Sequence, residues 1–143
     1  MKKSPIHATA DKVCRALKKS GVSFAIAGAL ATNAHGHTRT TEDVDILITR
    51  EGLERFKERW LGLGWTENFP GSKGFRDTEN NVKVDVLLSG DYPGDGKPKP
   101  VCFPDPSEVG IPDEFGIPII KLKNLIELKL ASGMTASHRL RDL

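Results

Sequence analysis

Residues 38–49 read TRTTEDVDILIT, and the second half of this stretch alternates acidic and apolar side chains. Successive side chains of a β-strand point to opposite faces of the sheet. The alternation therefore predicts a strand over residues 43–49 with two different faces. One face carries Val44, Ile46 and Ile48, and the other carries Asp43, Asp45 and Leu47. The aspartates need not enter the core that the first face forms.

A second stretch, VKVDVLL at residues 82–88, repeats the alternation, with Asp85 opposite the valines. Residues 74–90 predict a β-hairpin that turns near Asn80 and Asn81. If the two predicted strands are neighbours, their three aspartates converge at one edge of the sheet. Carboxylates gathered in this way raise one another's pKa unless a cation neutralises them. Clusters of oxygen ligands suit Mg²⁺ or Mn²⁺.

Upstream of the acidic strand, VSFAIAG at residues 22–28 is short, apolar and closed by Gly28. It predicts a buried strand that turns at Gly28 into a short helix over residues 29–35. The N–H groups and dipole at a helix N-terminus favour phosphate. Two divalent ions about 3.5–4 Å apart can stabilise both the attacking and the leaving oxygen of a phosphoryl-type displacement. The glycine and the carboxylates together indicate chemistry on a triphosphate.

Helical spacing of apolar residues predicts further helices over residues 6–19, 51–64 and 121–133, the last within a C-terminal helical segment. Residues 89–118 hold seven of the nine prolines, which excludes a long helix there and predicts an ordered meander or a mobile flap. The expected fold class is α/β (α+β), with a small mixed sheet flanked by helices. We expect residues 1–143 to form a single domain, because 143 residues are too few for two well-packed cores.

Composition excludes several classes of protein. Apolar residues at 38% and charged residues at 28% are ordinary for a globular chain, which excludes disordered and fibrous classes. The net charge of +2 is far below that of a dedicated nucleic-acid binder. Cys14 and Cys102 lack the spacing of a zinc site or a disulfide framework, so a cytoplasmic location is expected. No apolar run is long enough to span a bilayer, and no membrane partner is expected.

The stretch AGALATNAHGHTRTTEDVDILI, at residues 27–48, followed by VKVDVLL, resembles the signature of the nucleotidyltransferase superfamily with the polymerase-β-like fold. The likeness is strongest to small bacterial members, namely the abortive-infection toxin nucleotidyltransferases and the aminoglycoside and lincosamide nucleotidyltransferases. They share a run of Gly, Arg and Asp-x-Asp like Gly36, Arg39, Asp43 and Asp45. The resemblance covers residues from about 24 to 88.

The resemblance implies that two Mg²⁺ ions, or Mn²⁺ ions, are bound by Asp43, Asp45 and Asp85. It also implies that Asp85 helps to deprotonate the acceptor hydroxyl. These three residues are therefore the expected catalytic and metal-binding groups.

The nucleotide-binding residues are also implied by the resemblance. Gly28 and Ala29 would admit the triphosphate, and Arg39 would bind a phosphate or fix the loop. Lys129 matches a helix lysine that the toxins place near the nucleotide.

The expected activity is transfer of an NMP from an NTP to an acceptor hydroxyl, with release of pyrophosphate. A tRNA end or another RNA, or a protein side chain, would suit a toxin-like enzyme that belongs to a toxin–antitoxin pair. A hydroxyl of a small-molecule drug would suit an antibiotic-resistance enzyme. Because a chain this short has little room for an acceptor-recognition domain, a partner protein or a homo-oligomer is expected.

Other readings of the same residues stay open. Ala29 stands where the family usually has a second Gly or Ser, which suits a non-catalytic module that binds nucleotide or a partner. A metal-dependent nuclease would usually add a lysine close behind its last acid, and none follows Asp85 in VKVDVLL. His35 and His37 lack the further ligands of a zinc site. The KPKP run at residues 97–100 reads as a solvated loop or as a basic arm that touches RNA.

Overall fold

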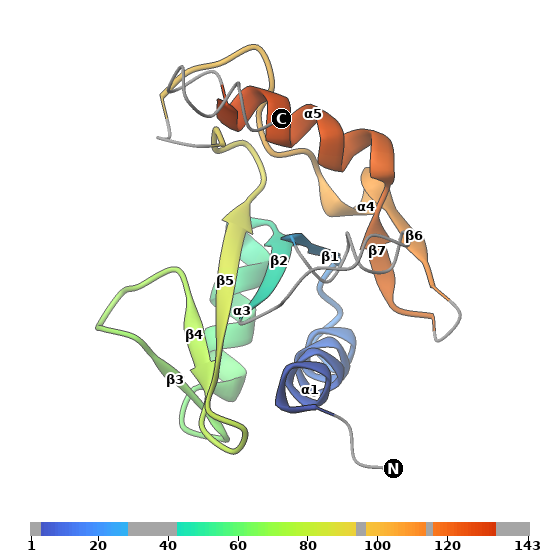
Figure 1. Cartoon of the computed structure of the whole chain (residues 1–143). Coiled ribbons are helices and arrows are strands. Elements are labelled where there is room, and N and C mark those ends of the chain that lie inside the picture. Colours follow the sequence, from blue (N-terminus) through green and yellow to red (C-terminus); the bar gives the residue numbers. More distant parts are fainter. Residues whose placement is uncertain (1–3, 29–42, 94–96, 114–115, 134–143) are drawn as a thin grey trace.

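The computed structural model describes residues 4–28, 43–93, 97–113 and 116–133 (Figure 1). These residues form four helices: α1 (Pro5–Lys19), α3 (Arg50–Trp60), α4 (Pro106–Val109) and α5 (Leu122–Gly133). They also form seven strands: β1 (Phe24–Ala27), β2 (Val44–Ile48), β3 (Trp65–Glu67), β4 (Phe75–Asp77), β5 (Val82–Leu88), β6 (Gly110–Pro112) and β7 (Pro118–Ile120). The α/β class predicted from the sequence is confirmed.

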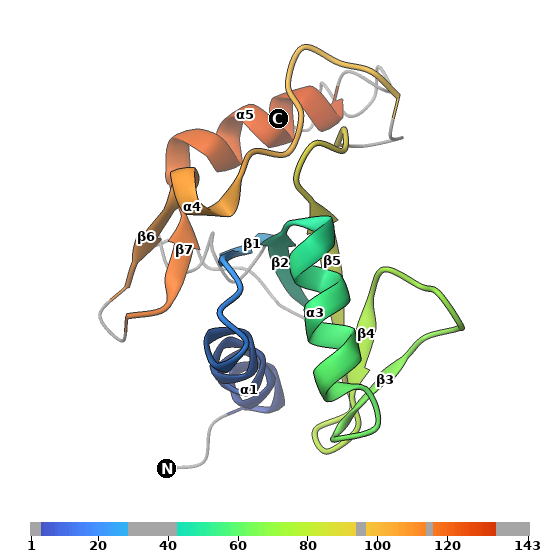
Figure 2. The same ribbon diagram turned by 180° about the vertical axis from the view of Figure 1, so that it is seen from behind.

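The strands form a single mixed sheet in the order β3-β4-β5-β2-β1-β7-β6. The acidic strand β2 lies in the middle, antiparallel to β1 and parallel to β5. The hairpin of β4 and β5 is antiparallel, as predicted. In Figure 1 helix α3 lies behind β2 and β5, and in Figure 2 it lies in front of them, so this helix covers one face of the sheet. Helix α5 lies across one end of the sheet in both views.

Local signals set the ends of the first two helices. The Ser4 side chain accepts a hydrogen bond from the His7 N–H and caps α1, which ends before Gly21 with φ of 67°. The Thr49 side chain caps α3 in the same way by accepting from the Gly52 N–H. Helix α3 ends at Trp60, earlier than the predicted residue 64, because Leu61 is already extended and leads into β3.

The two faces of the sheet differ, as the alternation predicted. We call the side of Val44, Ile46 and Ile48 the helix face, because α1 and α3 pack there, and all three residues are fully buried. An aromatic cluster of Phe56, Trp65 and Phe75 completes this core, with ring centroids 4.5 to 5.5 Å apart. Burying each of these large side chains stabilises the fold by about 1.5–3 kcal/mol.

The opposite side of the sheet carries Asp45, Leu47, Lys83 and Asp85, and we call it the acidic face. Burial is not confined to the helix face, because Leu47 and Ala25 on the acidic face are also 0% exposed. Helix α4 packs against β1 on this side, where Gly110 adjoins Ala25. Strand alternation therefore predicted which side chains share a face, but the burial of Leu47 depends on elements far away in the sequence.

The proline-rich segment is the main addition to the predicted sheet. It forms no long helix in its described part, as expected, but it contributes α4 and the strands β6 and β7. Strand β7 pairs with β1 in parallel through Ile119 and Ile26, and β6 extends the sheet by pairing with β7. Hydrogen bonds join Gly90 N–H to the Phe103 carbonyl and Phe103 N–H to the Asp91 carbonyl. These contacts are those of an ordered meander.

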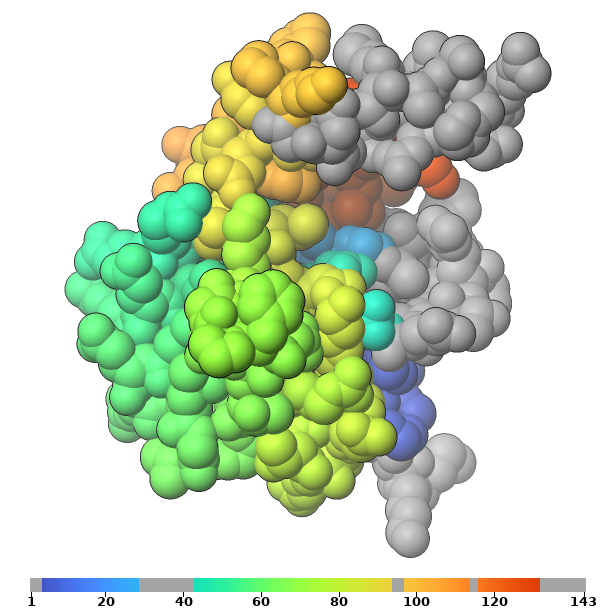
Figure 3. Space-filling model, turned by 90° about the vertical axis from the view of Figure 1, so that its left-hand side faces the viewer, coloured from blue at the N-terminus to red at the C-terminus, as the bar shows by residue number. Residues whose placement is uncertain are grey.

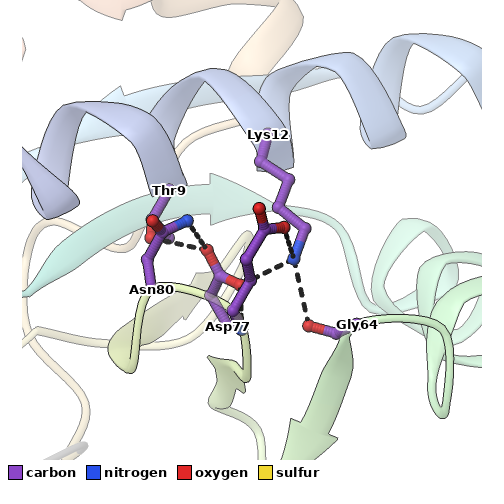
Figure 4. A network of polar contacts seen from close by, with 6 residues as sticks. Thr9, Lys12, Gly64, Asp77 and Asn80 are labelled. Atoms are coloured by element: carbon purple, nitrogen blue, oxygen red, sulfur yellow. Dashed lines mark hydrogen bonds and ion pairs between the residues drawn. The ribbon is translucent and has the colours of Figure 1, made fainter. Parts of the chain in front are cut away.

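Helix α1 is attached to the β4–β5 hairpin by a buried polar network around Asp77 (Figure 4). The Asp77 carboxylate accepts hydrogen bonds from the Thr9 hydroxyl (2.7 Å), the Lys12 ammonium (2.6 Å) and the Asn80 amide (2.7 Å). Lys12 also donates to the Gly64 carbonyl at 3.2 Å. Each buried polar group in this network has a hydrogen-bond partner. The network therefore holds α1 against the β4–β5 hairpin without leaving a buried charge unpaired.

None of the described helices is long and apolar enough to cross a membrane.

Candidate active site

The site is built on the pairing of β2 with β5. In this parallel pair Asp45 lies directly opposite Asp85, as Val44 does Val84. Residues opposite each other share a face, and paired strands lie about 4.8 Å apart. The expectation that the two acidic strands are neighbours is therefore confirmed for Asp45 and Asp85. Figure 3 shows atoms at the start of β2, in cyan, at the surface beside yellow-green atoms of β5.

The pKa of Asp45 reflects this arrangement. Its pKa is raised to about 6, chiefly by partial burial and then by the negative charges of Asp85 and Asp43, while Lys83 acts in the opposite direction. The other two predicted carboxylates thus both lie within electrostatic reach of Asp45. Ionising Asp45 costs free energy because two other negative charges lie near it.

Lys83 is the cation closest to the acidic pair among the described residues. Its Nζ lies 3.2 Å from Asp85 Oδ1, and the two side chains are 42% and 35% exposed. Asp45 forms no ion pair with any described lysine, arginine or histidine. Lys83 therefore pairs with only one of the two opposed carboxylates. Within the described residues, no ion pair balances the negative charge of Asp45. The alternation of VKVDVLL also places Lys83 on the face of Asp85, but nothing in the sequence gives this lysine a role.

Gly28 lies at the end of β1, beside Asp45. Ala27 is the register partner of Asp45, and Gly28 follows with φ of 63°, in the left-handed region. A Cβ atom at Gly28 would overlap the Asp45 carboxylate. The sequence had indicated that Gly28 leaves room for a phosphate. In the fold its missing side chain first leaves room for Asp45, which no local sequence signal could have revealed.

Not every predicted site residue can be placed. Ala29 and Arg39 lie outside the described residues, as do His35, His37 and the helix predicted over 29–35. Lys129 lies on the exposed side of α5 and forms no ion pair with the described aspartates. Its assignment to the nucleotide site stays a prediction.

The acidic pair offers some of the ligands that a divalent ion requires. Within the described residues, no three His, Cys, Asp or Glu side chains stand close enough to hold a metal ion. The pair of Asp45 and Asp85 nevertheless supplies oxygen donors from two adjacent strands at one register position. The raised pKa of Asp45 shows that added positive charge there would be favourable. Carboxylate oxygens are the donor type that Mg²⁺ and Mn²⁺ prefer, and Asp43 acts electrostatically on the same site. The described residues therefore supply part of such a ligand set, and the metal stays a prediction.

Two hollows in the described surface lie away from this pair. One, of about 590 Å³, is lined by residues around β3 that include Trp65, Asn68 and Phe69. The other, of about 210 Å³, lies near the start of α3 and includes Thr49 and Arg55. Neither is lined by Asp45 or Asp85.

Comparison with solved structures shows that the chain has the nucleotidyltransferase fold. It is similar to a protein of Thermotoga maritima assigned provisionally as a nucleotidyltransferase, with a TM-score of 0.66, 18% identity, and coverage of 94% of this chain and 89% of that one. It is also similar to ANT(2″)-Ia, an aminoglycoside nucleotidyltransferase solved in complex with adenylyl-2″-tobramycin, with a TM-score of 0.53, 12% identity, and coverage of 94% and 92%. No family model matches the chain, and no curated protein does.

Proposed function

We propose that this chain, which has the nucleotidyltransferase fold, is a metal-dependent enzyme that moves an NMP from an NTP to an acceptor hydroxyl. The observation that carries the proposal is the direct register of Asp45 and Asp85 on paired parallel strands. The raised pKa of Asp45 and the close approach of Gly28 support it. Fold likeness alone would not distinguish an enzyme from a binding protein.

Asp45 and Asp85 would hold two Mg²⁺ or Mn²⁺ ions, together with Asp43. Bound there, the ions would supply the positive charge that stabilises the attacking and leaving oxygens of the displacement. The chain's own part is to fix the donors: β2 and β5 set the spacing of the two carboxylates, and Gly28 leaves room for one of them. Above pH 6 Asp45 is mainly ionised, so its oxygens are available as ligands.

The NTP would lie over Gly28, with Ala29, Arg39 and Lys129 as further nucleotide contacts. The acceptor oxygen forms a bond to the α-phosphorus while the bond from that phosphorus to the bridging oxygen breaks. The hydroxyl proton passes to Asp85 and pyrophosphate leaves. RNA, a protein side chain or a small molecule would serve as acceptor. We infer that the enzyme acts in the cytoplasm as a component of a toxin–antitoxin pair. It would work with a partner protein or as a homo-oligomer.

A second candidate is a non-catalytic protein on the same fold that binds a nucleotide or a partner. The observation that favours it is Ala29, which stands where the family pattern has a second Gly or Ser.

Calorimetric titration tests the enzyme proposal. Mg²⁺ and each of the four NTPs are titrated into the wild type, Asp45→Asn and the matched control Asp91→Asn, which alters a partly exposed aspartate paired with Lys73 and Arg50. We expect Asp45→Asn to weaken metal binding by at least about tenfold and the control to leave it unchanged. Absence of metal and nucleotide binding by the wild type would rule the enzyme out.

Incubation with labelled NTP, Mn²⁺ and a cell extract then separates the two candidates. An enzyme transfers label to RNA, protein or a small molecule, and the transfer is lost in Asp45→Asn. Binding of NTP without any transfer would favour the non-catalytic protein.

A further inference from the structure

Helix α5 carries apolar side chains on two opposite sides. Leu128 and Ala131 lie on one side and are buried in the core. The other side carries Leu122, Ile126 and Leu130, which are 39%, 52% and 46% exposed. A helix that is apolar on all sides is typical of a position that is covered on all sides. The described part of the fold covers only one side of α5.

The three exposed residues form a ridge, which we call the apolar ridge. Leu122, Ile126 and Leu130 follow one another at intervals of four, so they lie in one row along the helix. The row is about 12 Å long, at 1.5 Å per residue. In Figures 1 and 2 helix α5 lies at one end of the molecule, with the sheet on one side of it. Rows of this spacing pack into the grooves of another helix, whereas a helix surface offers no free backbone edge to an added strand.

Lysines border the apolar ridge on both sides. Lys123 and Lys129 lie three residues before and after Ile126, and both are exposed. Neither forms an ion pair with a described carboxylate. Glu127, the one acidic residue of α5, lies beyond Lys123 around the helix. A second copy of this chain docked through the same ridge would add two further lysines to the interface, and like charges brought together disfavour association. Acidic residues on the docked helix would instead complement both lysines.

We propose that the apolar ridge is the docking surface for an amphipathic helix of another protein, which carries acidic residues on both sides of its own apolar stripe. Burial of the three ridge side chains supplies the affinity, and the lysines select an acidic partner over a basic one. The ridge lies on a different element from Asp45 and Asp85, so the inference does not depend on the NMP transfer proposed above.

Fluorescence anisotropy on the full chain tests the docking surface with two labelled peptides. The first is an 18-residue amphipathic peptide with leucines at helical spacing and glutamates on both sides of them. The second has lysines in place of the glutamates. We expect the acidic peptide to bind at least about tenfold more tightly than the basic one at low salt. Failure of the acidic peptide to bind, or equal binding of both peptides, would overturn the proposal.

Substitutions locate the binding to the ridge. Ile126→Gln should weaken binding of the acidic peptide about five- to tenfold, because it removes the central apolar contact. Lys123→Gln should weaken it about twofold and reduce its dependence on salt. Leu63→Gln and Lys73→Gln are the matched controls, at an apolar residue that is 65% exposed and a lysine paired with Asp91. Equal losses in the variants and their controls would overturn the proposal.

Three further measurements distinguish other occupants of the ridge. Each of these results would overturn the proposal: a wild-type dimer in sedimentation that Ile126→Gln dissociates, binding to anionic lipid vesicles that Ile126→Gln abolishes, and a urea midpoint that Ile126→Gln lowers more than Leu63→Gln does. The last would show that the chain covers the ridge itself. We expect a monomer, no vesicle binding and unchanged midpoints.

The same proteins separate this inference from the proposed function. Asp45→Asn should bind the acidic peptide as the wild type does. If the wild type binds the peptide but neither metal nor NTP, the proposed function fails and the docking surface stands. If it binds metal and NTP but not the peptide, the docking surface fails and the enzyme stands.

Discussion

Two aspartates of this sheet, Asp77 on the helix face and Asp45 on the acidic face, are both shielded from water and yet ionise very differently. Burial is the largest influence on each and raises the pKa of both. At Asp77 the hydrogen bonds from Lys12, Asn80, Thr9 and the Glu79 N–H outweigh burial and hold the pKa at about 2. At Asp45 the neighbouring carboxylates add to burial, and the pKa is about 6.

The contrast shows that the partners of a carboxylate, and not its burial alone, decide the direction in which its pKa moves. On the helix face the chain itself supplies the donors that Asp77 requires. On the acidic face it brings further negative charge toward Asp45, with Lys83 bonded to Asp85. A cation bound beside Asp45, as proposed above, would lower the free-energy cost of ionising it, whereas Asp77 already has its donors within the chain.

Removing Asp77 should produce the largest effect. Asp77→Ala removes a fully buried carboxylate and leaves the partly buried Lys12 ammonium and the buried Thr9 hydroxyl without their main partner. We expect the free energy of unfolding to fall by about 3 kcal/mol, measured by urea denaturation at pH 7. Asp45→Asn is the matched comparison and should not destabilise the protein. Equal losses in the two variants would contradict the distinction between the two faces.

Crowding Gly28 should have the next largest effect. Gly28→Ala places a Cβ atom against the Asp45 carboxylate in a backbone of positive φ, and we expect a loss of about 2 kcal/mol. Combining it with Asp45→Ala should recover part of that loss, because the overlap disappears while the backbone strain remains. A double-mutant cycle on unfolding free energies measures the coupling. Strict additivity would show that the two residues do not touch.

The two aspartates should give opposite dependences of stability on pH. The pKa of Asp77 is lowered, so its contribution is present above pH 3.8 and is lost as pH falls toward 2. The pKa of Asp45 is raised, so the contribution of its protonated form is present below pH 3.8 and is lost as pH rises toward 6. After allowance for partial exposure, we expect Asp45→Asn to remove a decline of about 1 kcal/mol between pH 4 and 6. Urea titrations at several pH values test this, and an unchanged decline in the variant would contradict it.

A smaller effect concerns Asp85 alone. Asp85→Asn should lower the pKa of Asp45 from about 6, yet leave it above 3.8, because burial is the larger cause. Carboxyl NMR titration of the variant and the wild type measures the difference. A pKa of Asp45 that does not move would mean that the two carboxylates do not sense each other, against their register.

Some of this arrangement followed from sequence alone. The period-two alternation at residues 43–49 and 82–88 is local, so it predicted which side chains share a face. It also led to the hypothesis that Asp45 and Asp85 lie together if the two strands are neighbours. Helix α1 followed from the helical spacing of its apolar residues, and the β4–β5 hairpin from its turn residues and strand alternation, all of which act within a few positions. Strands β3, β6 and β7 were missed, because three residues are too few to show a period.

Tertiary structure decided the rest. The register of Asp45 with Asp85 and the approach of Asp45 to Gly28 join residues that are far apart in the chain. Sequence periodicity states the face on which a side chain lies but not its neighbour across the sheet. Pairing between strands sets that neighbour, and with it the pKa of Asp45.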